Sequence, residues 1–467
     1  MLGYPPSFNS ACSARLPRRA ALAGIAALAA MVLSEPTRAL AQQRDPLGQL
    51  VAEALRNNLG LATERFAEAR SVAQVKEARG LFFPSATIES RYTRQSGTLN
   101  LGDLINPAYA ALNRIQGADR FPTNIDLTLP LAHDSRVRLV QPLFNETIRR
   151  NYSLARHRFD GDRSHRLGVA RRLAADVQIA YVAVADARSA VSIYEASLAL
   201  VVESERVSQR LLDAGRAAPD VVFRARAERS DVAQKLAEAR ERVDAAARAL
   251  NQLLGRGLDA AVDSIPDSAL CFDLDISEDT AVASALSRRE ELAEVDAGIG
   301  AADAAVGLAR ASFLPTVGVA FDYGFQGQDV RFNRQTDYWT ASVALSWNLF
   351  NGGRDAARHE AARAEAERAR VSRRDLEDRI RLEVRQAYEA AVVAHAAIAT
   401  ADDRLGAARK TFDLVRRRYQ EGVASQIEFL DARTQLTGAE LNRALTVHRY
   451  AARYFDLERA AALRSIH

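Results

Sequence analysis

A long helical pattern breaks and restarts within the stretch Tyr419-Gln-Glu-Gly-Val-Ala-Ser-Gln-Ile-Glu-Phe-Leu-Asp-Ala-Arg-Thr-Gln-Leu436. Glycine is favoured just after a helix end and serine at the start of the next helix, so Gly422 and Ser425 predict a tight turn between two helices. A related stretch, Leu212-Asp-Ala-Gly-Arg-Ala-Ala-Pro-Asp-Val-Val-Phe-Arg-Ala-Arg-Ala-Glu228, has Gly215 in the place of Gly422. The chain is therefore predicted to be a duplication that folds back once in each copy. Further corresponding pairs are Pro219 and Gln426, Ala225 and Ala432, and Arg226 and Arg433.

Each turn follows a long apolar seam whose steps alternate between four and three residues, the spacing of a coiled coil. The first seam runs through Val169, Leu173, Val177, Ala180, Val184, Ala187, Val191, Tyr194, Leu198 and Val201. The second runs through Leu376, Ile380, Val384, Ala387, Ala391, Ala394, Ile398, Ala401, Leu405, Ala408, Phe412, Val415 and Tyr419. Helices over 145–213 and 352–420 would each be about 100 Å long at about 1.5 Å per residue, too long for a compact core. We therefore expect an assembly of several closely packed helices.

Each copy has the same predicted order of elements: a shorter helix, a β-hairpin, the long helix and a return helix. The hairpins are expected over 84–143 and 315–350, each after a proline that ends the preceding helix. The first repeat then occupies 42–257, a linker 258–276 and the second repeat 277–467. In the less regular first hairpin, residues 104–115 are expected to form a short helix.

The second hairpin has the clearer alternation of apolar and polar residues. Each of its two strands covers about 12 residues, and a tilted strand needs about 9–11 to cross a bilayer. A half-buried hairpin in a soluble protein shows the same alternation, so this pattern alone leaves both environments open. In a membrane, the residues expected to face lipid are Phe321, Tyr323, Trp339, Val343 and Trp347, and those expected to face the lumen are Asp322, Ser342 and Ser346.

Residues 1–41 have the pattern of a secretory signal peptide. A basic segment, Arg15-Leu-Pro-Arg-Arg19, precedes an apolar run, and Ala39-Leu-Ala41 matches a cleavage motif. The alternative, an N-terminal membrane anchor, needs about 18 apolar residues, more than this run has. Cys12 precedes the apolar run and is not placed to become a lipidated N-terminus. The formal net charge of +4 falls to +1 once the four arginines and one glutamate of 1–41 are set aside, which gives no case for nucleic-acid binding.

In this order, the elements resemble the TolC-like outer-membrane efflux protein (outer membrane factor) family. The sharpest marks are Ser346-Trp-Asn-Leu-Phe-Asn-Gly-Gly-Arg354 at the strand-to-helix junction and the turn from Tyr419 to Leu436. Phe313-Leu-Pro315 and Gln141-Pro-Leu-Phe144 add to the resemblance. Each segment is weak alone, but their order and duplication make the resemblance strong over the whole chain beyond residue 41.

The resemblance implies a mainly α fold with a pair of β-hairpins. Three chains would form an α-barrel tunnel of long helical hairpins and share a 12-stranded transmembrane β-barrel, with four strands from each chain. Physical reasoning agrees, because four strands cannot close a pore and open strand edges are excluded from lipid. The implied function is a passive outer-membrane channel of a tripartite efflux or type I secretion system in a Gram-negative bacterium. The implied partners are two further copies of the chain, a periplasmic adaptor (membrane fusion) protein, an inner-membrane pump or ABC exporter, and outer-membrane lipid.

The resemblance also places the pore constriction at Glu428 and Asp431, at the periplasmic end of the tunnel. Acidic side chains at a helix start also favour the helix dipole, which is the alternative explanation for them. Tyr419 matches a tyrosine that helps to hold the entrance shut, and Gly422 and Gly215 form the turns at the tip. The acid that the family places in the first turn is replaced by Val221, beside Asp220, which is a departure from the family's closed-state latch.

The sequence predicts no enzyme, no cofactor and no metal site. The histidines show no paired spacing such as H-x-x-x-H, and no Gly-Lys-Ser/Thr follows Gly353. An exported coiled-coil adaptor or structural protein is the alternative function, although it does not explain two hairpins at matching places. Drugs, metals and secreted proteins all remain open as substrates.

Overall fold

A computed structural model describes residues 46–94, 99–126, 128–129, 132–265, 270 and 272–465. The expected signal peptide, 1–41, and Cys271 lie outside these residues. The described chain is mostly helical, with a four-stranded antiparallel sheet, and confirms the predicted fold class. It divides into two compact units: unit 2 comprises Ala69–Gly161 and Asp296–Val371, and unit 1 comprises the remaining segments.

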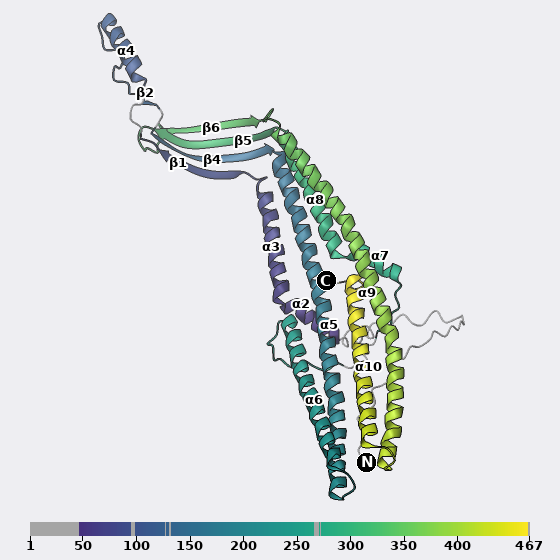
Figure 1. Ribbon diagram of the computed structural model, residues 1–467. Coiled ribbons are helices and arrows are strands. Elements are labelled where there is room, and N and C mark those ends of the chain that lie inside the picture. The colour runs from purple at the N-terminus through teal and green to yellow at the C-terminus, as the bar shows by residue number, and fades with distance from the viewer. Residues whose placement is uncertain are drawn as a thin grey trace, which may run out of the picture. The chain divides into compact units, whose positions relative to one another are not determined.

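Unit 2 contains the four-stranded sheet, in the order β1-β4-β5-β6 (Figure 1). The strands are β1 (Ser85–Tyr92), β4 (His133–Phe144), β5 (Thr316–Gly327) and β6 (Asp337–Ser346). β4 and β5 pair across the two repeats, with Arg138 opposite Asp322. The two hairpins therefore form a single sheet whose outer strands are β1 and β6.

The two faces of this sheet differ sharply in polarity. One face carries cross-strand ion pairs, with Arg136 2.7 Å from Glu89 and Arg138 3.6 Å from Asp322. The other face carries large apolar side chains that are exposed in the single chain: Ile88, Val137, Leu139, Phe321, Tyr323, Trp339 and Val343. The described residues thus leave an apolar sheet face uncovered.

The second hairpin ends earlier than its alternation predicted. β6 stops at Ser346, so Trp347 lies beyond the strand, where its indole N–H donates to the Phe313 carbonyl at 3.1 Å. The backbone then turns into α9 (Arg354–Gln420), and the Asn351 side-chain amide donates to the Asp355 carboxylate at 2.6 Å. Residues 347–350, which the alternation assigned to the strand, therefore lie between β6 and α9.

The first hairpin carries a folded insertion between β1 and β4. It contains β2 (Leu99–Asn100), α4 (Gly102–Gln116) and β3 (Thr128–Leu129), with β2 and β3 paired. The helix expected over 104–115 is confirmed by α4. The second hairpin has only residues 328–336 between its strands.

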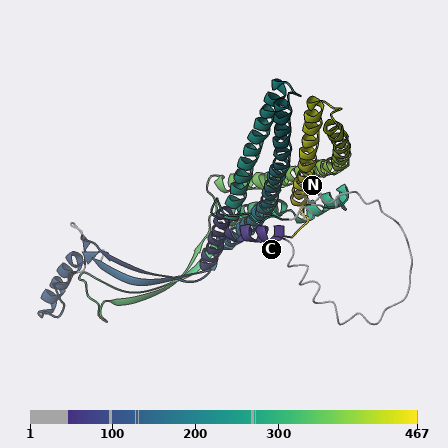
Figure 2. The ribbon, with the colours of Figure 1, turned by 90° about the horizontal axis from the view of Figure 1, so that it is seen from below.

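Unit 1 contains the two helical hairpins except for the first turns of their long helices, residues 146–161 and 354–371, which belong to unit 2. α5 (Glu146–Asp213) returns as α6 (Pro219–Leu254), and α9 returns as α10 (Gln426–Ala460). Figures 1 and 2 both show α5 beside α6 and α9 beside α10. Every residue of the two predicted seams is buried or half-buried, which confirms the coiled-coil spacing. α5 also buries Tyr181 and Val182 outside its seam, because it packs on more than one side.

The shorter helix of each repeat is broken in two, and the sequence pattern does not predict these breaks. In the first repeat it is observed as α2 (Pro46–Asn57) and α3 (Leu59–Gly80). Asn58 separates them, because its side-chain oxygen accepts a hydrogen bond from the Leu61 N–H at 3.0 Å and caps α3. In the second repeat, Arg289 separates α7 (Glu278–Arg288) from α8 (Glu290–Ala311).

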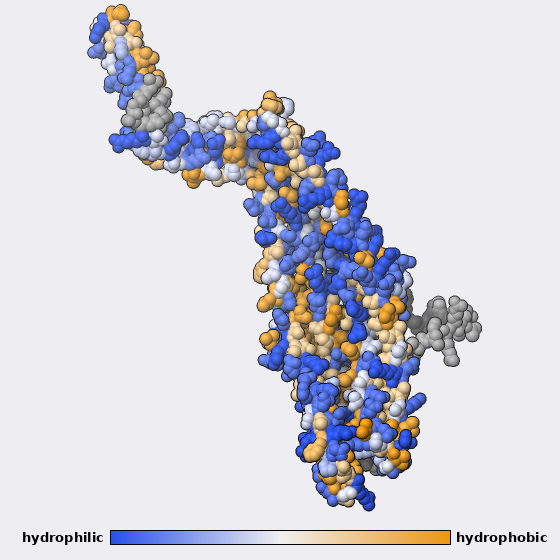
Figure 3. Space-filling view, viewed as in Figure 1, coloured by the Kyte–Doolittle hydropathy of each residue, from blue (hydrophilic) through white to orange (hydrophobic). Residues whose placement is uncertain are grey.

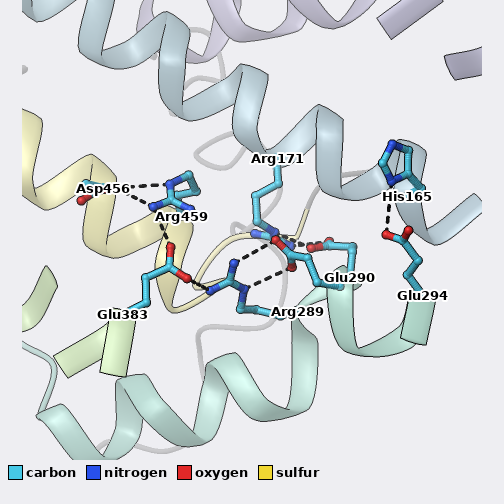
Figure 4. Close-up of polar contacts among 9 residues, drawn as sticks. His165, Arg171, Arg289, Glu290, Glu294, Glu383, Asp456 and Arg459 are labelled. Atoms are coloured by element: carbon cyan, nitrogen blue, oxygen red, sulfur yellow. Dashed lines mark hydrogen bonds and ion pairs between the residues drawn. The ribbon is translucent and has the colours of Figure 1, made fainter. Parts of the chain in front are cut away.

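Arg289 lies in a cluster of ion pairs that joins several helices of unit 1 (Figure 4). Its side chain is 7% exposed, lies 2.8 Å from Glu291 and also pairs with Glu383 of α9. Burial would raise the pKa of Glu291, but the hydrogen bonds and charge of Arg289 outweigh it and hold that pKa below its ordinary value. Neighbouring ion pairs join Arg459 to Glu383 (2.9 Å), Arg459 to Asp456 (2.8 Å) and Arg171 to Glu290 (2.7 Å).

Candidate functional site

Both hairpin turns close with a glycine in the left-handed conformation. The φ angle is 67° at Gly215 and 77° at Gly422. The Gly422 N–H donates to the Tyr419 carbonyl at 3.1 Å and the Val423 N–H to the Arg418 carbonyl at 2.8 Å, and the first turn has the same pair of bonds. This arrangement satisfies the last carbonyls of a helix. The two glycines thus end α5 and α9.

Glu428 has a local structural role at the start of α10. The Glu428 N–H donates to the Ser425 hydroxyl at 3.2 Å, and the Glu428 carboxylate accepts from the Ser425 N–H at 3.3 Å, which forms a capping box. These backbone and side-chain hydrogen bonds from Ser425 lower the pKa of Glu428. Asp431, three residues on, accepts from the Gln435 amide at 2.9 Å. Both acids are exposed in the single chain.

Tyr419 packs inside the second hairpin. Its ring stacks on the ring of Phe429 in α10, with centroids 4.8 Å apart and planes 17° apart. The centroid of the Phe412 ring lies 5.7 Å from that of Phe429. Burial raises the pKa of Tyr419, and the hydroxyls of Ser208 and Ser204 on α5 partly offset that shift. Tyr419 thus joins α9 to α10 through its ring and presents its hydroxyl to the first hairpin.

Near the turn, two polar side chains of α10 bind the first hairpin directly, and we call these the inter-hairpin contacts. The Gln426 amide donates to the Ser208 hydroxyl at 3.0 Å and to the Val221 carbonyl at 3.2 Å. Arg433, 2% exposed, donates to Ser197 of α5 and Glu228 of α6. Burial lowers the pKa of Arg433, and the negative charge of Glu228 opposes that shift.

The inter-hairpin contacts make the two repeats unequal. Arg226, the counterpart of Arg433, has a side chain that is 57% exposed and lies 3.4 Å from Glu205. Val221, where the resemblance expected an acid, takes part through its backbone carbonyl instead. The acid that pairs with the buried arginine is Glu228, two helical turns after Val221.

The duplicated sequence motif marks Arg433 and Gln426 only as members of corresponding pairs and predicts no role for them. One signal was present: Gln426, Phe429, Leu430 and Arg433 are spaced so that they share one face of α10. That face is buried apart from the partly exposed Gln426. Polar residues at both ends of an otherwise apolar face need hydrogen-bond partners on the facing helices.

Four of the five residues expected to face lipid lie together on the apolar face of the sheet. Tyr323 pairs with Trp339, Phe321 pairs with Ala341, and Val343 pairs with Val319. The fifth residue, Trp347, follows the end of β6. Asp322 and Ser342 lie on the polar face, as their alternate positions in the strands require.

Among the helices that the structure describes, none is both long and apolar enough to cross a membrane. The described residues also contain no group of three or more histidine, cysteine, aspartate or glutamate side chains that could hold a metal ion.

The arrangement of two helical hairpins and one four-stranded sheet is shared with known proteins. The sequence pattern of the family described as "Outer membrane efflux protein" matches residues 50–256 and 281–462. This chain belongs to the outer membrane efflux protein family. The predicted family is therefore confirmed.

Individual members of the family are more distant. The outer membrane efflux protein BepC of Brucella suis is 25% identical over 264 residues, which cover 56% of this chain and 57% of BepC. Protein CyaE of Bordetella pertussis is 31% identical over 190 residues, 39% of this chain and 37% of CyaE. The matched regions thus span about half, or less, of these relatives. The Campylobacter jejuni CmeC outer membrane channel has the same fold, with a TM-score of 0.73 at 16% identity over 89% of this chain and 85% of CmeC.

Proposed function

We propose that three copies of this chain form a channel in the outer membrane of a Gram-negative bacterium, with the helical hairpins in the periplasm. The observation that carries the proposal is a four-stranded sheet with an uncovered apolar face and two outer strands, β1 and β6, in a member of an outer-membrane channel family. Unpaired strand edges are excluded from lipid, and four strands are too few to close a barrel. Three copies supply twelve strands, with β6 of each copy beside β1 of the next.

The channel would act as a passive conduit within a tripartite efflux or type I secretion system. An inner-membrane pump or ABC exporter would supply the substrate, and a periplasmic adaptor would join that pump to the hairpin turns. The chain itself would need no catalytic group and no cofactor. Family membership and the efflux function named for BepC support this proposal.

The turn ends of the hairpins would form the gate. The inter-hairpin contacts tie the second hairpin to the first within one chain, and Tyr419 adds a packed ring beside them. Glu428 and Asp431 from three chains would line the entrance, since both are exposed next to the second turn. Opening would require the inter-hairpin contacts to break.

Membrane fractionation and channel recording test this function. The protein should fractionate with the outer membrane, migrate as a heat-sensitive oligomer on a gel, and conduct ions when added to a planar bilayer. A soluble periplasmic monomer without conductance would instead favour the adaptor or structural function.

The two faces of β6 provide a matched test of the membrane barrel. Val343→Arg places a charge on the apolar face, and an arginine near the bilayer midplane of a barrel costs about 2–4 kcal/mol. Ser342→Arg, one residue away on the polar face, should assemble and fractionate like the wild type. The amount of heat-sensitive oligomer in the outer membrane is the measurement. Equal tolerance of both substitutions would contradict a lipid-facing strand.

The acidic entrance predicts cation selectivity. Six carboxylates in a narrow ring would repel one another and attract cations. The double variant Glu428→Gln, Asp431→Asn removes the charges while glutamine can keep part of the capping box. Its cation preference and its block by multivalent cations from the periplasmic side should both weaken, with the oligomer intact. Unchanged selectivity and block would leave these acids as helix-start residues only.

A further inference from the structure

The insertion in the first hairpin carries an exposed apolar stripe that neither the sheet nor the helical hairpins use. α4 is held on one side by the segment that follows it, residues 117–126. The side-chain amide of Asn113, a 7% exposed residue, donates to the Phe121 carbonyl at 2.7 Å and accepts from the Phe121 N–H at 2.9 Å. Asn106 makes the same pair of bonds with Ile125, both at 2.8 Å.

These contacts make α4 and its following segment a folded unit. Asn106 and Asn113 are seven residues apart, so they lie on the same face of the helix. The rings of Tyr109 and Phe121, 5.3 Å apart, add an aromatic contact on that side. One face of α4 is therefore covered.

The opposite face of α4 is apolar and exposed. Leu104, Ala108, Ala111 and Ile115 follow steps of four, three and four, the spacing that α5 and α9 use in their buried seams. At about 100° per residue, this stripe lies about 180° from Asn106 and Asn113. Leu104 is 76% exposed and Ile115 is 81% exposed. Figure 3 shows apolar residues gathered along one edge of α4.

We propose that this stripe packs against the same stripe of α4 from the neighbouring copies, which forms a helical cap over the outer mouth of the channel. The inference rests on the proposed function, because it needs several copies around one axis. The insertion continues from β1, an outer strand that would pair with the next copy, so it starts beside the junction between copies. It also leaves the sheet at the strand ends that do not lead into the long helices, which would be the outer side.

The composition of α4 favours a helix as the occupant over lipid. Helices that lie on a membrane surface are rich in lysine and arginine and carry tryptophan, phenylalanine or leucine on the apolar face. α4 has a single arginine, no lysine and no tryptophan. Alanine at the two central stripe positions allows close approach of a partner helix, as alanine does in the seams of α5 and α9.

Cysteine crosslinking in whole cells tests this cap. In a full-length chain with Cys12 and Cys271 replaced by serine, Ala111→Cys should give an oxidised pair of chains on a denaturing gel. Asp119→Cys, exposed on the covering segment, should stay a single chain and serves as the control. The native oligomer of each variant is measured in parallel by unheated gel migration, so loss of the oligomer reports failure of the trimer rather than of the cap.

Two results would overturn the cap. One is an intact oligomer in which Ala111→Cys crosslinks no more than Asp119→Cys. The other is Ile115→Trp fluorescence quenched by brominated phospholipid, which would assign the stripe to the membrane surface.

The double variant Leu104→Asp, Ile115→Asp should increase conductance while the oligomer persists, because like charges would separate the capping helices. If these two substitutions abolish the Ala111→Cys crosslink but leave conductance unchanged, the helices meet without restricting the mouth. That result would overturn the closing function.

Discussion

Replacing Arg433 with methionine is expected to loosen the two helical hairpins from each other and to open the channel. Methionine fills most of the same space, so the main effect is loss of the bonds to Ser197 and Glu228. Removing one partner of a buried ion pair lowers the free energy of unfolding by about 3–5 kcal/mol. Because Glu228 is partly exposed, we expect a loss of about 3 kcal/mol. The denaturant midpoint of the solubilised protein should fall, and closed-state conductance in a planar bilayer should rise.

The duplication supplies the control for this prediction. Arg226→Met changes the corresponding residue of the first repeat, whose exposed pairing with Glu205 is worth at most about 1 kcal/mol. It should leave conductance unchanged. A double-mutant cycle with Glu228→Gln should give a strong coupling energy for Arg433. If Arg433→Met and Arg226→Met have the same small effects, the inter-hairpin contacts do not hold the turn ends closed.

Arg289→Met is expected to destabilise unit 1 by a similar amount, about 3 kcal/mol, because it leaves the partly exposed Glu291 without its buried partner and removes one partner from Glu383. The thermal midpoint of the solubilised protein should fall. Arg385→Met is the matched control, since the exposed Arg385 lies 2.9 Å from Glu278 and this surface pair is worth at most about 1 kcal/mol. Equal midpoints for the two variants would contradict a stabilising role for the cluster.

The same cluster predicts a pH dependence. The folded-state pKa of Glu291 lies below its ordinary value of 4.5, so its ionised form is favoured by folding. The resulting stability is fully present above the unfolded-state pKa and is lost as the pH falls through the lower folded-state value. The difference in thermal midpoint between the wild type and Arg289→Met should therefore shrink on acidification below about pH 4.5. A constant difference across that range would show that Glu291 does not contribute.

The architecture could be predicted because its signals repeat. Seam positions such as Val184 and Ile380 lie at coiled-coil spacing in both copies. Residues at that spacing share one face of a helix, and both of these side chains are buried. The turn glycines were equally readable, because a left-handed backbone at Gly215 and Gly422 strongly favours glycine. Alternation in β5 and β6 predicted two faces of different polarity, and the register keeps them apart.

Features that depend on a single side chain were not readable in the same way. Arg226 and Arg433 occupy equivalent positions of the duplicated motif, yet one is exposed and the other buried. Which arginine meets the other hairpin is decided by packing between helices far apart in the sequence. The helix breaks at Asn58 and Arg289 have the same origin: the Asn58 amide also binds the Leu253 carbonyl at 2.9 Å, and Arg289 pairs with α9.

Native mass spectrometry of the detergent-extracted protein tests whether separate chains close the sheet into one barrel. We expect a single species of three copies that dissociates only when the protein is denatured. A folded species of one copy, with β1 and β6 left as open edges, would contradict it.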